Sequence, residues 1–279
     1  MREIDAREIG DSVARLCIEA NISLPDDLRC RLDEFSGRET WDTAREVLDR
    51  IRENYELAER KRVPICQDTG MAVVFIELGQ EVHVRGSLRD AVNDGVRRGY
   101  EDGYLRKSVV RDPLRRDNTG DNTPAVLYTE LVDGESVKIT VAPKGFGSEN
   151  MSRIAMLAPA EGIDGVRDFV VRTIESAGSN PCPPVVVGVG IGSTFEGVAM
   201  LAKRALLRDL RETNPDPFYA ELELELLEKI NALGVGPQGY GGLTTALGVS
   251  ILAAPTHIAG LPCAVNVGCH VTRHMTEVL

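Results

Sequence analysis

Three of the six cysteines lie in loops whose composition is typical of functional sites. Cys66 lies two residues before Asp68, Cys182 lies between two prolines, and Cys269 directly precedes His270. Far apart in sequence, they form no local knuckle but could converge in space. Three thiolates holding a 4Fe–4S cluster would leave one iron without a protein ligand, and that iron could polarise a substrate hydroxyl and carboxylate. The alternative is three ordinary thiols.

The other three cysteines have apolar or helical surroundings. Cys17 lies on the apolar face of a helix expected over residues 9–22, and Cys30 lies in the helical pattern PDDLRCRLDEF. Cys263 belongs to the apolar run LPCAV and is expected in the core. We interpret these three as buried or incidental thiols. Since no close C-x-x-C pair occurs, the sequence predicts neither a zinc ribbon nor a thioredoxin-type site.

Two further features leave alternatives open. The stretch VGVGIGSTFEG (187–197) follows a strand-like run and precedes a helical one, but its glycine spacing differs from the dinucleotide-binding G-x-G-x-x-G pattern. An anion at a helix N-terminus, or a tight strand-to-helix turn, fits it better. His257 lies in a glycine-rich loop and is a candidate catalytic group, although a lone histidine is more often structural.

Composition excludes several classes of partner. With 43 acidic against 32 basic residues, the formal net charge is −11, which argues against nucleic-acid or anionic-lipid binding. An anionic substrate must then be held by a few local cations. No apolar run reaches 18 residues, and the charged N-terminus lacks the apolar core of a signal peptide. We therefore expect a cytoplasmic protein with no membrane contact.

Hydrophobic periodicity predicts helices over most of residues 1–62 and near 88–103, 163–178, 195–211 and 219–233. Strands are expected at 71–78 and 81–86, joined at Gly79-Gln80. A hairpin is expected from 125–132 and 136–143, with its turn at Asp133-Gly134. The remaining glycine- and proline-rich stretches are expected as loops: 65–70, 105–125, 143–150, 180–184, 187–197 and 236–270.

These elements show no regular βαβ alternation and no internal repeat. The predicted fold class is α+β: a helical N-terminal region, then antiparallel strands and helices around a loop-built cluster site. Because no linker separates residues 1–62 from the rest, we expect a single domain over 1–279. The acidic helix around 219–233 is either a docking surface or a solvated helix.

Eight segments together resemble class I fumarase and its close relative, the L-tartrate dehydratase alpha subunit. They occur in order between about residues 63 and 274: ICQDTG, DNTGDNTPA, KGFGSENMSR, NPCPP, GSTFEGVAMLAKRALLR, LGVGPQGYGG, THIAGLPCAVN and GCHVTRH. No single segment is sufficient, but their joint order is specific. The resemblance implies a 4Fe–4S hydro-lyase that reversibly hydrates fumarate to (S)-malate, or one that dehydrates L-tartrate to oxaloacetate.

The resemblance also implies roles for individual residues. Dehydration removes a poorly leaving hydroxyl and a proton from the adjacent carbon, so an acid near the iron is needed. We expect Asp68 to be that acid, oriented by His257. The other implied roles are cluster ligation by Cys66, Cys182 and Cys269, substrate contact by Gln67, backbone approach to the substrate by Gly147, and carboxylate binding by Arg106.

Two departures qualify the resemblance. Single-chain relatives continue into a further domain that supplies more substrate-binding groups, so we expect that domain on a separate beta subunit, in an alpha2beta2 enzyme with paired alpha chains. Phe146 stands where many fumarases have glycine. Two other classes remain as alternatives. An electron-transfer iron–sulfur protein usually has four closely spaced cysteines, and a nucleotide-binding or scaffold subunit would contain no iron.

Overall fold

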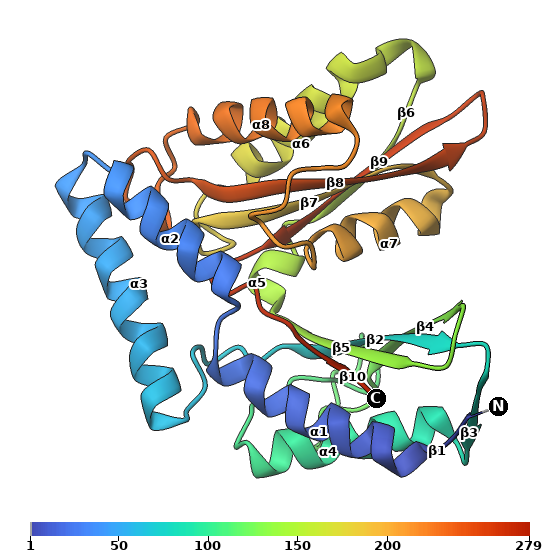
Figure 1. Cartoon of the computed structure of the whole chain (residues 1–279). Coiled ribbons are helices and arrows are strands. Elements are labelled where there is room, and N and C mark those ends of the chain that lie inside the picture. Colours follow the sequence, from blue (N-terminus) through green and yellow to red (C-terminus); the bar gives the residue numbers. More distant parts are fainter. Residues whose placement is uncertain (1) are drawn as a thin grey trace. The chain divides into compact units, whose positions relative to one another are not determined.

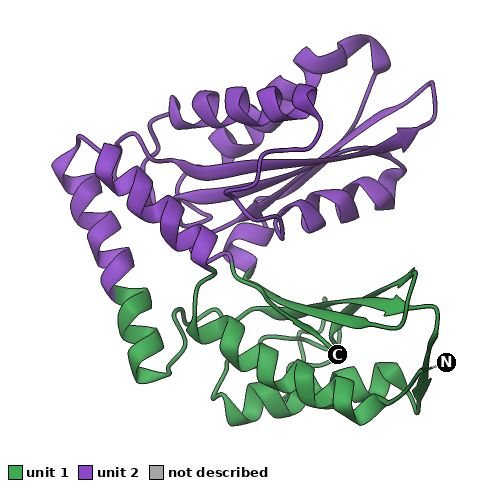
Figure 2. Cartoon of the chain, in the orientation of Figure 1, with its two compact units in different colours: residues 1–25, 54–145, 273–279 green, residues 26–53, 146–272 purple. Residues whose placement is uncertain are grey.

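The computed structural model describes residues 2–279 and confirms the α+β class. The chain forms two compact units, each built from separate segments of the sequence (Figure 2). Unit 1 consists of residues 1–25, 54–145 and 273–279, and unit 2 of residues 26–53 and 146–272. The expectation of one domain over 1–279 stays a prediction. The described residues contain no helix long and apolar enough to cross a membrane.

Unit 1 is a four-stranded mixed sheet with two helices against it (Figure 1). The strand order is β10 (Met275–Val278), β5 (Val137–Lys144), β2 (Met71–Gly79), β4 (Val126–Val132). The helices are α1 (Ala6–Ile22) and α4 (Leu88–Asp102), which pack against each other. A small parallel pair, β1 (Arg2–Asp5) with β3 (Val82–Arg85), and the last part of α3 (Asp42–Lys61) also belong to the unit.

The apolar stripe of α1 forms the core of unit 1 together with β2 and β5. Ile9, Val13 and Cys17 of α1 are completely buried, as are Val74 of β2 and Ile139 of β5. Burying one such aliphatic side chain contributes about 1.5–3 kcal/mol. At the start of α1, Asp5 accepts from Arg7 N and forms a capping box with Glu8, which fixes where the helix begins. The sequence periodicity predicted this helix correctly.

The hairpin predicted over residues 125–143 is wrong in its pairing, although both of its strands exist. β2 lies between β4 and β5, running parallel to β4 and antiparallel to β5. The chain bends at residues 133–135 without forming a hairpin turn, and this segment crosses the end of β2: Gly79 N donates to Ser136 O at 2.9 Å. A Cβ on Gly79 would lie 2.3 Å from Gly134 O, so only glycine allows this crossing. Strands 71–79 and 82–85 are likewise adjacent in sequence but belong to different sheets.

Unit 2 contains a second mixed four-stranded sheet with helices on both faces (Figure 1). Its strand order is β6 (Arg153–Leu157), β9 (Leu261–Gly268), β7 (Val185–Ser193), β8 (Ala246–Thr256). Helices α6 (Gly162–Ala177) and α8 (Pro217–Asn231) cover one face, and α7 (Phe195–Ala205) covers the other. The unit also holds α2 (Asp26–Arg38), the first part of α3 (Asp42–Lys61) and the short helix α5 (Phe146–Glu149).

Two stretches expected as loops contain the central strands of this sheet. Most of 187–197 belongs to β7, and most of 246–268 forms β8 and β9. Their glycines misled the prediction, because in β7 glycine serves close packing. A Cβ on Gly188 would lie 2.2 Å from Ala202 O, and one on Gly190 would lie 2.3 Å from Val198 O, both in α7. The glycine repeat therefore lets α7 approach the sheet, and the strand-to-helix reading of this stretch is correct. The helix expected over 195–211 ends earlier, at Ala205.

The crossing over β2 can be tested by substituting Gly79 with alanine. The new methyl group would overlap backbone atoms of residues 134 and 136, so we expect Gly79→Ala to lower the free energy of unfolding by about 1–3 kcal/mol. Gly37→Ala is the control, because a Cβ there meets no atom within 4 Å in exposed α2; it should add about 0.5 kcal/mol. Chemical denaturation measures both, and unchanged stability of Gly79→Ala would contradict the crossing.

Candidate functional site

One group of candidate residues lies in the loop 65–70 of unit 1, which carries Cys66, Gln67 and Asp68. This loop folds on itself: Asp68 N lies 3.4 Å from Cys66 Sγ, and Asp68 Oδ1 accepts from Gly70 N at 3.1 Å. Gln67 is exposed, whereas Cys66 and Asp68 are half-buried. A Cβ on Gly145 would lie 3.0 Å from Asp68 Oδ2. The carboxylate of Asp68 is therefore packed against the backbone at Gly145, in a place where a larger residue would displace it.

Buried polar side chains form hydrogen bonds to the backbone of this loop and fix its position. The hydroxyl of Tyr100, which is completely buried on α4, lies 2.8 Å from Thr69 O and 2.9 Å from Gly70 O. Asn122, also completely buried, donates to Gly70 O at 3.2 Å. Burial raises the pKa of Tyr100 well above its usual value, so this phenol stays protonated as a hydrogen-bond donor.

Arg273 holds the same loop from another side. Its guanidinium is almost fully buried, with Nη2 donating to Asp68 O at 2.8 Å and Nε donating to Asn21 Oδ1 at 3.1 Å. Sequence reasoning did not single out Tyr100, Asn122 or Arg273. The positions of Asn122 within the segment DNTGDNTPA and of Arg273 within GCHVTRH are the signals that could have indicated these two residues.

Thr69 connects this loop to the segment that carries Arg106. Its hydroxyl accepts from Arg106 N at 2.9 Å and lies 3.3 Å from Arg106 O. Asn122 continues the connection, because its Oδ1 accepts from Ser108 N at 2.7 Å. Arg106 itself is exposed and forms no ion pair within residues 2–279. The structure thus brings the backbones of Asp68 and Arg106 into one framework and leaves a guanidinium available to an anion.

A second group of candidate residues lies in unit 2, where Cys182 and Cys269 are brought together. Cys182 is exposed and has a left-handed backbone, with φ of 55°. Its carbonyl oxygen accepts from the backbone N–H of His270 at 3.2 Å, so Cys182 touches the residue next to Cys269. Gly147, on α5, belongs to the same neighbourhood: a Cβ there would lie 3.7 Å from Asn180 O.

The helix that carries Gly147 is anchored by polar contacts within unit 2. Glu149 accepts from Lys203 Nζ at 2.6 Å and from Asn266 Nδ2 at 2.8 Å, which fixes α5 to α7 and β9. Asn266 also donates to Ser152 Oγ at 2.8 Å, just beyond α5. Three of the sequence segments that carry the resemblance meet here, and their polar residues position the loop at Gly147.

His257 occupies a different place in unit 2. It lies exposed at the turn between β8 and β9, where its Nδ1 accepts from Ala259 N at 3.2 Å. Cys269 directly follows the opposite end of β9. A strand of this length spans roughly 25 Å. The structure therefore does not bring His257 to the cysteines of its own unit, and its pairing with Asp68 stays a prediction.

The chemistry of the thiols fits a three-cysteine ligand set. Cys17 and Cys263 are completely buried, and burial raises the pKa of each thiol to about 12, so neither supplies a thiolate readily. Cys66, Cys182 and Cys269 all retain access to solvent. Cys30 is also exposed but lies on the regular helix α2. Among residues 2–279 no three His, Cys, Asp or Glu side chains are gathered for a single metal ion; Cys66 belongs to unit 1 and the other two thiols to unit 2.

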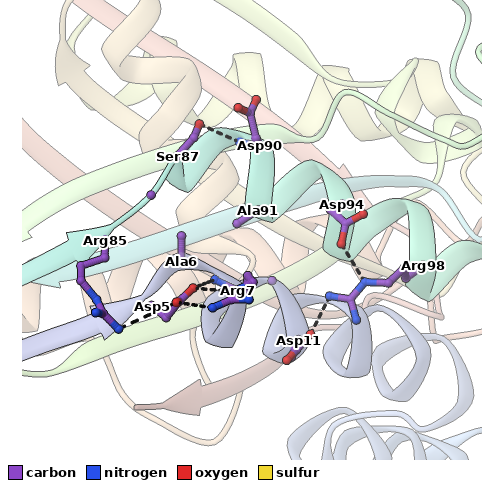
Figure 3. A pocket seen from close by; sticks show the side chains of 12 residues that line it. Asp5, Ala6, Arg7, Asp11, Arg85, Ser87, Asp90, Ala91, Asp94 and Arg98 are labelled. Atoms are coloured by element: carbon purple, nitrogen blue, oxygen red, sulfur yellow. Dashed lines mark hydrogen bonds and ion pairs between the residues drawn. The ribbon is translucent and has the colours of Figure 1, made fainter.

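A groove of about 760 Å³ in unit 1 is lined by none of the predicted site residues. Figure 3 shows its three arginines, Arg7, Arg85 and Arg98, paired with acidic side chains of the groove. Arg98 contacts Asp11 at 2.7 Å and Asp94 at 2.8 Å, and Arg7 contacts Asp5 at 2.8 Å. The bond from Arg7 holds the pKa of the Asp5 carboxyl below its usual range. With these charges mutually satisfied, the groove offers no excess cation for an anionic ligand.

Comparison with known proteins gives the same family over nearly the whole chain. The family model described as Fumarate hydratase (Fumerase) matches residues 10–278. A protein of Methanocaldococcus jannaschii, named as a candidate L(+)-tartrate dehydratase subunit alpha, is 42% identical over 274 residues, covering 95% of each chain. The L(+)-tartrate dehydratase subunit alpha of Escherichia coli K12 is 33% identical over 272 residues, covering 96% of this chain and 90% of that one.

The link between Thr69 and Arg106 can be tested with an isosteric substitution. Thr69→Val leaves the partly buried Arg106 N–H without its acceptor, so we expect a loss of about 1–3 kcal/mol in unfolding free energy. Hydrogen exchange at the Arg106 amide should become faster. The same change at exposed Thr129 of β4 is the control and should alter stability by less than about 0.5 kcal/mol. Unchanged exchange at Arg106 in Thr69→Val would disprove the link.

Proposed function

Because this chain belongs to the class I fumarate hydratase family, a family of hydro-lyases, we propose that it is the alpha subunit of a 4Fe–4S-dependent enzyme that reversibly hydrates fumarate to (S)-malate. The observation that carries the proposal is the arrangement in unit 1. Asp68 lies two residues after the solvent-accessible thiol of Cys66. Thr69 joins this loop to the exposed, unpaired Arg106. An acid and a carboxylate-binding cation on one rigid framework suit a hydroxy-dicarboxylate.

Cys66, Cys182 and Cys269 are the proposed cluster ligands. When bound, a cluster held by three thiolates supplies an open iron, a Lewis acid for the substrate hydroxyl. The solvent access of these thiols, and the contact between Cys182 and His270, support the assignment. The burial of Cys17 and Cys263 argues against them as ligands.

The other residues bind substrate and move a proton. Arg106 presents a planar fork to one substrate carboxylate, while exposed Gln67 and the backbone at Gly147 contact the substrate. Asp68 donates a proton to the departing hydroxyl, and its carboxylate is held in place by Gly70 N–H and by the packing at Gly145. We keep His257 as the proposed partner of Asp68 on the basis of the resemblance alone.

A separate beta subunit is part of the proposal. The relatives named above are alpha subunits, which implies a beta partner. We propose that this partner supplies the remaining substrate-binding groups and the base for the C–H proton, in a cytoplasmic alpha2beta2 enzyme.

L-tartrate dehydration to oxaloacetate is the second candidate function. It is favoured by a specific observation: the relatives from both organisms carry the name of tartrate dehydratase. Both reactions remove water from a four-carbon hydroxy-dicarboxylate, so the same acid, cation and cluster serve either one.

The assay that tests the proposal is anaerobic. The full chain is reconstituted with iron and sulfide, combined with its beta partner, and supplied with malate or tartrate. We expect fumarate absorbance to appear from malate only when both chains and the cluster are present. Turnover of tartrate but not malate would replace the proposal by the second candidate. An iron-loaded complex inert to both would contradict a hydro-lyase.

The same assay includes a matched pair of variants. Asp68→Asn should lower kcat by about 10²-fold or more because it removes the proton donor, with iron content unchanged. Asp133→Asn changes an exposed aspartate in the 132–136 loop and should leave kcat unchanged. Equal activity of the two variants would remove Asp68 from the mechanism.

A further inference from the structure

We propose that Gln238 is a positioning residue that holds the loop of Cys182 in the geometry required for iron ligation. The proposal rests on the role proposed above for Cys182. Gln238 lies in the segment LGVGPQGYGG, on the short helical turn Pro237–Gly239 of unit 2. Neither its composition nor its spacing assigned it a role, and the proposed mechanism does not use it.

Gln238 grips the residue that follows Cys182 with two hydrogen bonds. Its backbone N donates to Pro183 O at 2.8 Å, and its side-chain Nε2 donates to the same oxygen at 2.7 Å. Both lone pairs of one carbonyl are thereby occupied by one residue. The Pro183–Pro184 peptide unit, one residue beyond the proposed ligand, is thus held by Gln238 through backbone and side chain together.

Cys182 and Gln238 both have left-handed backbones. Cys182 has φ of 55°, and Gln238 has φ of 53° and ψ of 16°. Residues other than glycine pay about 1–2 kcal/mol for this conformation, so it persists only where surrounding contacts determine it. Two such residues, connected through Pro183 and His270, indicate a geometry maintained for function. The left-handed turn leaves Cys182 exposed, whereas Pro181 and Pro183 on either side of it are buried.

Gln238 also reaches the segment of the second cysteine in this unit. His270, directly after Cys269, places its Nδ1 3.2 Å from Gln238 Nε2 and 3.0 Å from Cys182 O. With Nδ1 unprotonated, the ring accepts from the Gln238 amide; with Nδ1 protonated, it donates to the Cys182 carbonyl. In both tautomers the ring stays tied to this cluster of residues, so Gln238 fixes Cys182 relative to the residue that follows Cys269.

The loop that carries Gln238 is itself rigidly supported. Gly241 N donates to Val235 O at 2.9 Å, which closes the loop at its base. Leu243 N donates to Glu39 Oε2 at 2.9 Å, and Glu39 is buried. A support of this kind is what a metal ligand needs, because ligand loops that can move lose affinity and geometric definition.

The test separates positioning from simple stabilisation. Gln238→Met keeps an unbranched side chain and removes the amide. We expect the cluster-free variant to unfold thermally close to the wild-type midpoint. The reconstituted full chain should lose iron to a chelator at least about fivefold faster and show an altered EPR spectrum of the reduced cluster. Gln238→Gly, which tolerates the positive φ and keeps the backbone bond, tests the same point if the methionine variant misfolds.

Two controls define the outcomes. Gln80→Met, in the exposed turn after β2, should retain iron as the wild type does. Cys182→Ser should fail to retain the cluster; full iron content in that variant would refute the proposed function itself. If Cys182→Ser loses iron while both Gln238 variants hold it at the wild-type rate, the inference about Gln238 is overturned and the proposed function stands. Iron loss that only tracks a lowered unfolding midpoint would also overturn it.

Discussion

Buried hydrogen-bonding groups beneath the loop 65–70 set the geometry on which the unit 1 part of the site depends. Tyr100 and Asn122 have no access to water, so each unpaired polar atom there would cost about 1–3 kcal/mol. Their partners are backbone carbonyls and amides of the loops that carry Asp68 and Arg106. Moving either loop would leave these groups unsatisfied. The loops are therefore held as firmly as the helix α4 beneath them.

In unit 2, the loop that carries a candidate thiol is also fixed by hydrogen bonds, but there they act on a strained backbone. Cys182 lies on a strained, left-handed turn, and the strain is opposed by hydrogen bonds from Gln238 and His270. The sheet behind this turn is unusually close to α7 because Gly188 and Gly190 have no side chains. In both units, regular elements with buried faces support short loops whose thiols retain access to solvent. The reactive groups are few, and most of the polar residues around them serve to place the backbone.

Local pattern predicted the helices well and the strand pairing poorly. The apolar stripes of α1, α4, α6 and α8 follow directly from helical periodicity. The pairing of β4 with β5 failed because a hairpin is the nearest partner in sequence, whereas β2 comes from more than 45 residues earlier and separates them. Strands β8 and β9 were interpreted as loops because their flanks are rich in glycine and proline. Hydrophobic periodicity identifies strands but does not indicate which distant strands pair in a sheet.

The candidate site divides in the same way. From the sequence alone, Cys66, Asp68, Cys182 and Cys269 were identified as candidates. The signals were the unusual composition of their loops and the eight segments that carry the resemblance. Asn122 and Gln238 lie within segments that carry the resemblance. Their positioning role and that of Tyr100 could not be predicted, because these residues act through contacts with backbone atoms distant in the chain. For His257, the sequence suggested a role that the geometry of unit 2 does not support. Its place in a glycine-rich loop suggested a catalytic group, and the structure puts it at the other end of β9 from Cys269.

The most direct test of the account asks which thiols hold iron. The chain is treated with iodoacetamide under anaerobic conditions, with iron bound and again after chelation, and each cysteine is quantified by mass spectrometry. The account predicts that Cys66, Cys182 and Cys269 are protected together by iron and labelled after its removal. Cys30 should be labelled in both states, and the buried thiols Cys17 and Cys263 in neither. If any of the three proposed ligands is labelled equally with and without iron, the three-thiolate cluster is contradicted.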